Sequence, residues 1–383
     1  MSRLDELIAE LCPNGVKYKS LKAVCNISKG VQFNKSNMND EGTYPVINGG
    51  INPSGYIEHY NQNENTITVS QGGASAGYVN WMGRKFWAGA HCYVLSPCDQ
   101  LENRFLFHFI KSKEYILQEC QYGAGIPALG KATLEDLRIP VPPIEVQREI
   151  VRILDNFTEL TAELINSLSG ELLAREKQYA EFSRSLFAGV QPLRKTTLGE
   201  IVDIQMCKRI KKAQMTSSGD VPFFQNGTLG GTAKLFITNE LYDEFSRLYN
   251  YPQKGEVMLS TVGTVGKAIQ YDGSRSYYQD SNIVWLHRKT DEVTDEYLYW
   301  FCVSMPWKLP KRATLKHLHN YMIAETDIAI PPLDIQNQIV LRYQNLKTTF
   351  DQIIASLRLE GDNRRKQYEY YRDKLLTFKE KEA

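Results

Sequence analysis

The chain has 383 residues, of which 42% are hydrophobic and 23% are charged. This balance excludes a fibrous or disordered polymer and favours two or three domains with ordinary hydrophobic cores. With 45 Lys and Arg against 44 Asp and Glu, the net charge is only +1, so no global field attracts the chain to nucleic acid. If the chain binds DNA, the positive charge must be local.

No apolar run approaches the roughly 20 residues that a membrane-spanning helix needs. Residues 1–11 (MSRLDELIAEL) are acidic and amphipathic, unlike a signal peptide. We therefore expect a cytoplasmic protein with no membrane partner. The seven cysteines show neither Cys-x-x-Cys nor zinc-type Cys/His spacing, so we expect buried or incidental thiols and no metal site.

In chain order, residues 1–16 form the first predicted element. It is a short helical segment whose apolar side chains are Leu4, Leu7, Ile8 and Leu11. Residues 17–141 follow, with short β-branched and aromatic runs, Gly/Asn turns and few long helices. That sequence pattern predicts a compact mixed α/β domain.

Residues 142–194 predict a long helix. The paired prolines at 142 and 143 end the preceding strand and suit a helix start, and Glu145 is well placed in the first turn. Apolar side chains then recur at steps of three and four residues, which is typical of a coiled-coil seam. At 1.5 Å per residue, about 44 residues make a rod of roughly 65 Å, so we interpret the helix as a spacer. Gly170, in the middle of the pattern, favours a local kink or short break.

Residues 195–330 predict a second mixed α/β domain, a distant copy of the first. TLGEIVDI resembles SLKAVCNI, VPFFQNG resembles YPVINGG, and VMLSTVGTVG resembles ITVSQGGASAG. The offset between copies drifts from 177 (Pro45 to Pro222) to 190 (Ser70 to Ser260). These domains have therefore accepted insertions, which we place in surface loops.

Residues 331–383 repeat the long helix. PPLDIQNQIV at 331–340 copies PPIEVQREIV at 142–151, and KQYEYY at 366–371 copies KQYAEF at 177–182, both at an offset of 189. A constant offset means that the repeated unit carries no insertion. Gly361 lies mid-pattern, as Gly170 does in the first copy. The predicted fold class is thus α+β, with two mixed α/β domains, two long helices and a chain that closes on itself with pseudo-twofold symmetry.

The two helices have matching seams, so they can pack on each other as a coiled coil. We predict these seam residues as the helix-pair and partner interface. They are Ile150, Leu154, Phe157, Leu164, Leu168, Tyr179, Phe182, Leu186, Ile339, Tyr343, Leu346, Phe350, Ile353, Leu357, Tyr368, Tyr371 and Leu375.

A search for catalytic motifs finds almost nothing. GTVGKA at 263–268 echoes a phosphate-binding loop, but Thr261 stands where the first glycine belongs and Ala268 replaces the Ser or Thr that would hold magnesium. The histidines form no metal-binding pair at helical spacing, and no Ser/His/Asp or Cys/His arrangement is recognisable. Methyltransferase motifs and a nuclease carboxylate–lysine cluster are absent. We expect this chain to catalyse nothing alone.

Local positive charge occurs within the mixed domains. Such clusters suit contacts with DNA phosphates, and Gln, Asn and Arg side chains nearby could contact base edges. The alternative for each cluster is a solvent-exposed charged face with no DNA contact. The candidate DNA-binding residues are Lys29, Lys35, Arg84, Lys85, Lys208, Arg209, Lys211, Lys212, Lys267, Lys311, Arg312 and Lys316. The GASAG and GTVG turns are either places where the backbone approaches a phosphate or tight turns inside the fold.

Four features together resemble the specificity subunit of type I restriction-modification enzymes, across essentially the whole chain. They are the doubled PP(I/L)(E/D)(V/I)Q..IV helix start, the KQY near each helix end, the duplicated glycine turns and the LDELIAEL…GVKYKSL opening. The resemblance implies two target-recognition domains, each reading one half of a bipartite, asymmetric site in double-stranded DNA. It also implies that an antiparallel pair of long helices separates these domains and sets the spacer between the half-sites.

The resemblance further implies partners for the helices. Two modification (methyltransferase) subunits would dock on them, and restriction (translocase and nuclease) subunits would complete the complex. S-adenosylmethionine, ATP and magnesium would then bind those partners, and this chain itself would bind no cofactor.

Two other interpretations stay open. One is a fused methyltransferase, against which the missing motifs argue, and the other is a coiled-coil scaffold whose end domains bind no DNA. The copies also differ at GGASAG, one residue longer than VGTVG, and at GIPALGKATL, where the second domain has TLKHLHNYMI. Contact residues cannot be transferred between the domains at these loops.

Overall fold

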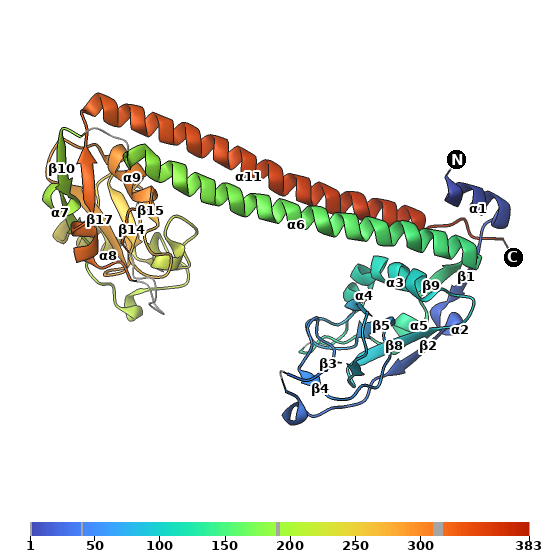
Figure 1. The fold of residues 1–383 in the computed structure, drawn as a ribbon. Coiled ribbons are helices and arrows are strands. Elements are labelled where there is room, and N and C mark those ends of the chain that lie inside the picture. The colour runs from blue at the N-terminus through green and yellow to red at the C-terminus, as the bar shows by residue number, and fades with distance from the viewer. Residues whose placement is uncertain (1, 40, 124, 189–191, 309–316, 383) are drawn as a thin grey trace. The chain divides into compact units, whose positions relative to one another are not determined.

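A computed structural model describes residues 2–39, 41–123, 125–188, 192–308 and 317–382. The chain folds into two compact units (Figure 1), of which unit 1 comprises Met1–Leu168 and Arg358–Ala383 and unit 2 comprises Ser169–Leu357. Each unit therefore holds one mixed α/β domain and one part of each long helix. The finer division into five segments at residues 16, 141, 194 and 330 stays a prediction.

Unit 1 contains three small sheets and several short helices. Its strands are β1 (Lys17–Ser20), β2 (Cys25–Lys29), β3 (Tyr44–Ile47), β4 (Tyr56–Ile57), β5 (Thr66–Ser70), β6 (Val79–Met82), β7 (Trp87–Ala88), β8 (Cys92–Pro97) and β9 (Arg138–Val141). Its helices besides the long ones are α1 (Arg3–Leu11), α2 (Leu21–Val24), η1 (Lys35–Asn37), α3 (Asn103–Ser112), α4 (Glu114–Glu119) and α5 (Lys131–Glu135). The sheets have the orders β2-β8-β5-β6, β4-β3-β7 and β1-β9.

The four-stranded sheet lies at the centre of the unit 1 core. Its two middle strands, β5 (TITVS) and β8 (CYVLSP), are rich in β-branched and aromatic residues and are buried along most of their length. Helix α3 packs across this sheet through Phe105 and Leu106, which are fully buried. The helix begins there because the Glu102 carboxylate accepts a hydrogen bond from the Phe105 backbone N–H at 2.6 Å.

Unit 2 repeats this topology. Its strands are β10 (Arg194–Thr197), β11 (Val202–Gln205), β12 (Val221–Phe224), β13 (Leu235–Ile237), β14 (Val257–Ser260), β15 (Ala268–Gln270), β16 (Tyr277–Tyr278), β17 (Ile283–Arg288) and β18 (Asp327–Ile330). Its shorter helices are α7 (Leu198–Ile201), η2 (Lys212–Gln214), η3 (Asn226–Thr228), α8 (Asn239–Leu248), α9 (Asp295–Val303) and α10 (Asn320–Ala324). The orders β11-β17-β14-β15, β13-β12-β16 and β10-β18 match those of unit 1 one for one.

Helix α8 has no counterpart among the described elements of unit 1. It follows β13 and precedes β14, the interval in which the offset between copies rises from 177 to 190. Its Tyr242 is buried in a second hydrophobic cluster of unit 2, with Tyr277 and Trp285. The insertion therefore does more than lengthen a surface loop, because part of it folds as a helix and enlarges the core.

The two long helices are α6 (Ile144–Ala188) and α11 (Leu333–Leu375). They pack antiparallel within each unit. In unit 1, Phe157 stacks on Tyr371 with ring centroids 6.1 Å apart. In unit 2, Tyr179 stacks on Phe350 at 4.4 Å. The predicted antiparallel helix pair is thus present.

The expected breaks at Gly170 and Gly361 are absent. Both residues lie inside uninterrupted helices, and neither has a positive φ. Glycine lowers helix propensity by about 1 kcal/mol relative to alanine, but long flanking helical segments override that preference.

The chain returns to its start within unit 1. The Val16 N–H donates to the Lys379 carbonyl at 2.9 Å, and the Lys381 N–H donates back to the Val16 carbonyl at 2.9 Å. Leu4 of α1 and Leu376 join the same buried cluster. The amphipathic stripe predicted for residues 1–16 therefore covers a core to which both ends of the chain contribute.

Candidate nucleic-acid interface

The strand register places several loops at one end of the four-stranded sheet in unit 1. The last residue of β2, Lys29, lies opposite Tyr93, and the last residue of β5, Ser70, lies opposite Cys92. The loops that follow β2 and β5 and the loop that precedes β8 therefore meet. The Gln71 N–H donates to the His91 carbonyl at 2.9 Å and fixes two of them together.

A fourth segment, residues 121–130, joins the same loop cluster. The Leu129 N–H donates to the Gln71 carbonyl at 2.7 Å, and the Gly73 N–H donates to the Pro127 carbonyl at 2.9 Å. The glycine turn after β5 and the GIPALG segment, about fifty residues apart in sequence, thus form one structure.

Unit 2 has the equivalent cluster. The Thr261 N–H donates to the Asn282 carbonyl at 2.9 Å, and the Leu318 N–H donates to the Thr261 carbonyl at 2.8 Å. The turn after β14 is therefore fixed to the segment before α10 by the same pair of backbone bonds. Loops that differ in sequence are held by the same backbone frame in both units.

The glycines of the two turns have different surroundings. A side chain at Gly266 would place its Cβ 2.6 Å from Trp307, and one at Gly77 would approach the α4 backbone to 2.9 Å. These two positions are tight turns packed inside the fold. Gly73, at φ +80°, faces open space, so at that position the backbone is accessible from outside.

The candidate basic residues of unit 1 lie in three segments. The Lys29 ammonium lies over the Tyr93 ring, 5.8 Å from its centroid, at the loop end of the sheet. Arg84 and Lys85 follow β6, whose last residue Met82 pairs with Thr66 at the opposite end. These two side chains lie over the rings of Tyr56 and Tyr60, respectively, and Lys35 is exposed in η1.

The candidate basic residues of unit 2 are only partly free. Arg209 Nε donates to Asp280 Oδ2 at 2.8 Å, and the Lys267 ammonium donates to the Leu229 carbonyl. Lys208 lies 4.9 Å from the centre of the Tyr249 ring. Lys211 and Lys212 are exposed. Lys311, Arg312 and Lys316 lie outside the described residues.

The predicted seam residues differ in burial. Ile150, Leu154, Ile339 and Tyr343 are buried. Leu164, Leu168, Tyr179, Leu186, Leu346, Phe350, Leu357, Tyr368 and Leu375 are half-buried, and Phe157, Phe182, Ile353 and Tyr371 are at least 38% exposed. Ile354, which the spacing did not select, is 8% exposed, so the seam shifts by one residue at that point.

Two glutamines in the repeated helix start connect each long helix to its domain. Gln147 is fully buried; its Oε1 accepts from the Glu102 N–H at 2.8 Å and its Nε2 donates to the Gln100 and Pro142 carbonyls. Gln336 is also fully buried, and it makes the same three bonds with the Thr294 N–H and the carbonyls of Glu292 and Pro331. Sequence reasoning found the PP…Q motif but gave the glutamine no role.

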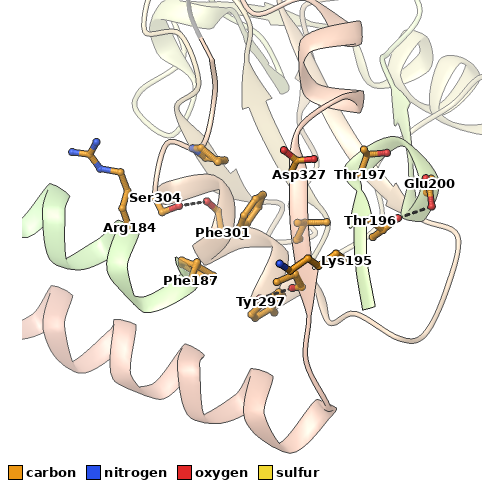
Figure 2. Close-up of a pocket in the computed structure, with 13 residues that line it drawn as sticks. Arg184, Phe187, Lys195, Thr196, Thr197, Glu200, Tyr297, Phe301, Ser304 and Asp327 are labelled. Atoms are coloured by element: carbon orange, nitrogen blue, oxygen red, sulfur yellow. Dashed lines mark hydrogen bonds between the residues drawn. The ribbon is translucent and has the colours of Figure 1, made fainter. Parts of the chain in front are cut away.

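A cavity of about 690 Å³ lies in unit 2 between the end of α6, the β10–β18 pair and α9 (Figure 2). Several of its hydroxyl groups donate hydrogen bonds within the protein. Tyr297 donates to the Ala329 carbonyl at 2.8 Å, and Thr196 donates to Glu200 at 2.6 Å. The Thr196 hydrogen bond, followed by that from Arg194, lowers the pKa of the Glu200 carboxyl.

In the described part of the chain, no three His, Cys, Asp or Glu side chains gather as a metal site would require. Five cysteines are buried in the cores, and burial raises the pKa of the Cys25, Cys92 and Cys207 thiols to about 12. No helix within the described ranges is both long and apolar enough to cross a bilayer.

Comparison with known proteins explains the duplication. The profile of the family described as "Type I restriction modification DNA specificity domain" matches residues 13–174 and again residues 192–358. A Haemophilus influenzae protein named as a type I restriction enzyme specificity subunit is 37% identical, covering 95% of this chain and 96% of its own length. The MjaVIII specificity subunit of Methanocaldococcus jannaschii is 24% identical over 88% of this chain and 86% of its own.

Solved structures share the fold. A chain from a structural study of type I R-M complex assembly and conformational transition matches with a TM-score of 0.72 at 18% identity, covering 95% of this chain and 98% of its own. The HsdS subunit of Thermoanaerobacter tengcongensis matches with a TM-score of 0.52 at 17% identity, covering 96% and 97%. The chain therefore belongs to the family of type I restriction-modification DNA specificity proteins, and each unit carries one match to the family profile.

Proposed function

We propose that this chain is the DNA-reading, non-catalytic subunit of a type I restriction-modification complex. Each unit reads one half of a bipartite, asymmetric site in double-stranded DNA. The observation that carries the proposal is the pair of loop clusters. The same backbone bonds hold the turn at Gln71 and the turn at Thr261, while the side chains that these loops present differ. Two domains that share a backbone arrangement but expose different side chains suit a DNA site whose two halves differ in sequence.

The long helices are proposed to hold the partners. Apolar side chains remain exposed along them, among them Leu160 at 62%, Leu173 at 69% and Leu341 at 58%. Exposed apolar rows on a helix pair favour docking of further helices. Two modification subunits would bind here, and restriction subunits would join the complex. S-adenosylmethionine, ATP and magnesium would bind those partners rather than this chain, which would act in the cytoplasm.

The first experiment co-expresses the chain with its cognate modification subunits and maps methylated adenines across the host genome. We expect one motif with two defined halves separated by a fixed number of unread base pairs. A continuous motif, or none in a complex that assembles fully, would contradict the proposal and favour a scaffold with end domains that bind no DNA.

A second experiment concerns binding to the phosphate backbone. Lys211 and Lys212 are exposed, so their replacement by Ala should weaken binding to all sequences alike and lower the salt dependence of binding by about 0.9 for each phosphate that is no longer neutralised. The matched control is Lys289→Ala, because that ammonium is already paired with the Asp203 carboxylate, 3.0 Å away. Loss of selectivity at one half-site alone would show instead that the two lysines read bases.

A further inference from the structure

The segment 122–128 of unit 1 presents two large side chains to solvent. Ile126 is 77% exposed and Tyr122 is 60% exposed. An isoleucine exposed to that degree gains nothing from folding, since its apolar surface stays in water. The position therefore suggests a contact made outside the chain.

The backbone beneath these side chains is firmly held. Tyr122 and Ala128 exchange two backbone hydrogen bonds of 2.9 Å, which close a hairpin. The hairpin is joined to the glycine turn through Pro127, and its base is fixed by the Tyr93 hydroxyl, which donates to the Leu129 carbonyl at 3.1 Å. A held loop presents its side chains at little conformational cost on binding.

Positive charge adjoins the hairpin. The Lys29 ammonium lies over the ring of Tyr93, the same residue that fixes the hairpin base. A cation beside an exposed pair of apolar and aromatic side chains matches what DNA offers, namely a phosphate next to base edges.

Unit 2 has the same frame with different side chains. Val262 forms a bridge with His317, and the Leu318 N–H bonds back to Thr261. His317 thus holds the place of Ala128, and Leu318 holds that of Leu129. The counterparts of Tyr122 and Ile126 precede His317 and lie outside the described residues.

We propose that Tyr122 and Ile126 are specificity-determining residues of unit 1. This inference rests on the proposed DNA-reading function. Ile126 is suited to the 5-methyl group of thymine, the apolar group that the major groove exposes. The Tyr122 hydroxyl can donate to or accept from an adjacent base edge.

The test uses the full complex with modification subunits and compares methylation motifs. The double variant Y122A/I126A should accept additional bases at one half-site and leave the other unchanged. The control is Y115A in α4, because Tyr115 is equally exposed at 58% but lies outside the loop cluster. Thermal unfolding should be unchanged in both variants.

A chemical substitution sharpens the role of Ile126. Each thymine of the unit 1 half-site is replaced in turn by deoxyuridine, which lacks only the methyl group. At one position we expect wild-type affinity to fall about fourfold, the factor for one buried methyl group, and I126A to show no such fall.

Three results are decisive. Unchanged motifs in Y122A/I126A would overturn the inference while a bipartite wild-type motif would leave the proposed function standing. Equal weakening of both half-sites would also overturn it, because a reader acts on its own half. A wild-type complex without any bipartite motif would instead contradict the proposed function itself.

Discussion

The rings of Tyr179 in α6 and Phe350 in α11 stack with centroids 4.4 Å apart and planes 23° from parallel. Both residues belong to unit 2, and Tyr343 meets Tyr179 edge-on at 6.2 Å. Three aromatic residues thus form the contact between the two helices where the seam was predicted. Their side chains supply a large apolar area to the contact between the two helices.

Phe350→Ala should loosen the helix pair of unit 2. Because the ring is half-buried, we expect a loss of about 2 kcal/mol, below the range for a fully buried phenylalanine. Amide hydrogen exchange in 169–188 and 333–357 measures the change. Leu341→Ala, on the same helix but 58% exposed, should alter exchange little. Equal exchange in the two variants would show that the stack does not hold the helices.

Gln147→Ala should destabilise unit 1 and leave unit 2 intact. The substitution leaves the Glu102 N–H and two carbonyls without their partner in a buried place, at a cost of about 3 kcal/mol. Gln336→Ala should act on unit 2 alone, through Thr294 and its neighbours. Exchange rates of the amides at 100–103 and 292–295 distinguish the units, and the exposed Gln344 supplies the control. A variant that loosens both units alike would contradict the local role of the glutamine.

His108 should make unit 1 less stable in mild acid. The imidazole is 2% exposed, and burial lowers its pKa despite the Asp155 carboxylate, which lies 2.8 Å from Nε2. Arg104 and Arg372 add like charge. Since the folded pKa lies below the unfolded value, the stability is complete above pH 6.5 and falls as the pH drops toward the folded pKa, by at most about 1.4 kcal/mol per pH unit.

Denaturant unfolding of unit 1 at pH 7.5, 6.5 and 5.5 checks this expectation. His108→Gln should flatten the pH dependence, since the amide can still donate to Asp155 but takes up no proton. His91→Gln, at an exposed position, should leave the dependence as in the wild type. The same slope in His108→Gln and in the wild type would show that another group titrates.

Replacing glycine by alanine should have opposite effects on stability in the long helices and in the tight turns. Gly170→Ala and Gly361→Ala meet no atom closer than 3.8 Å, so each should stabilise the protein by about 1 kcal/mol. Gly266→Ala should destabilise unit 2 by more than about 1 kcal/mol, because φ is +80° and the Cβ would meet Trp307. Thermal unfolding of the three variants gives the signs, and destabilisation by Gly170→Ala would indicate that the helix needs flexibility there.

The repeats were sufficient to predict the helices, the two mixed domains and their common topology. Local pattern carries these features, because apolar spacing and the PP…Q start are readable over a few turns. The shift of the seam from Ile353 to Ile354 was not readable, since the two isoleucines are adjacent and only packing distinguishes them. Helix α8 was taken for loop insertion because a single offset difference says nothing about whether the added residues fold.

For the candidate DNA contacts, the sequence predicted only where positive charge is concentrated. The pairing of Arg209 with Asp280 joins residues 71 positions apart, and that of the Gln71 turn with Leu129 spans 58. No local sequence pattern encodes such long-range contacts. A run of basic residues therefore looks the same in the sequence whether its charges are free or are neutralised by distant carboxylates. Tyr122 and Ile126 were missed for the converse reason, because apolar residues in a sequence suggest a core until the exposed hairpin is seen.

The backbone hydrogen bonds between Val16 and residues 379–381 affect the order in which the two units can fold during synthesis. Unit 2 is one continuous stretch of sequence, whereas the core of unit 1 includes Leu4 and Leu376. A ribosome releases residues in order, and domains generally fold once their sequence has emerged. Unit 2 can therefore complete its core during synthesis, while unit 1, although it is begun first, waits for residues 376–381. The half of the protein that is translated first is the half that finishes folding last.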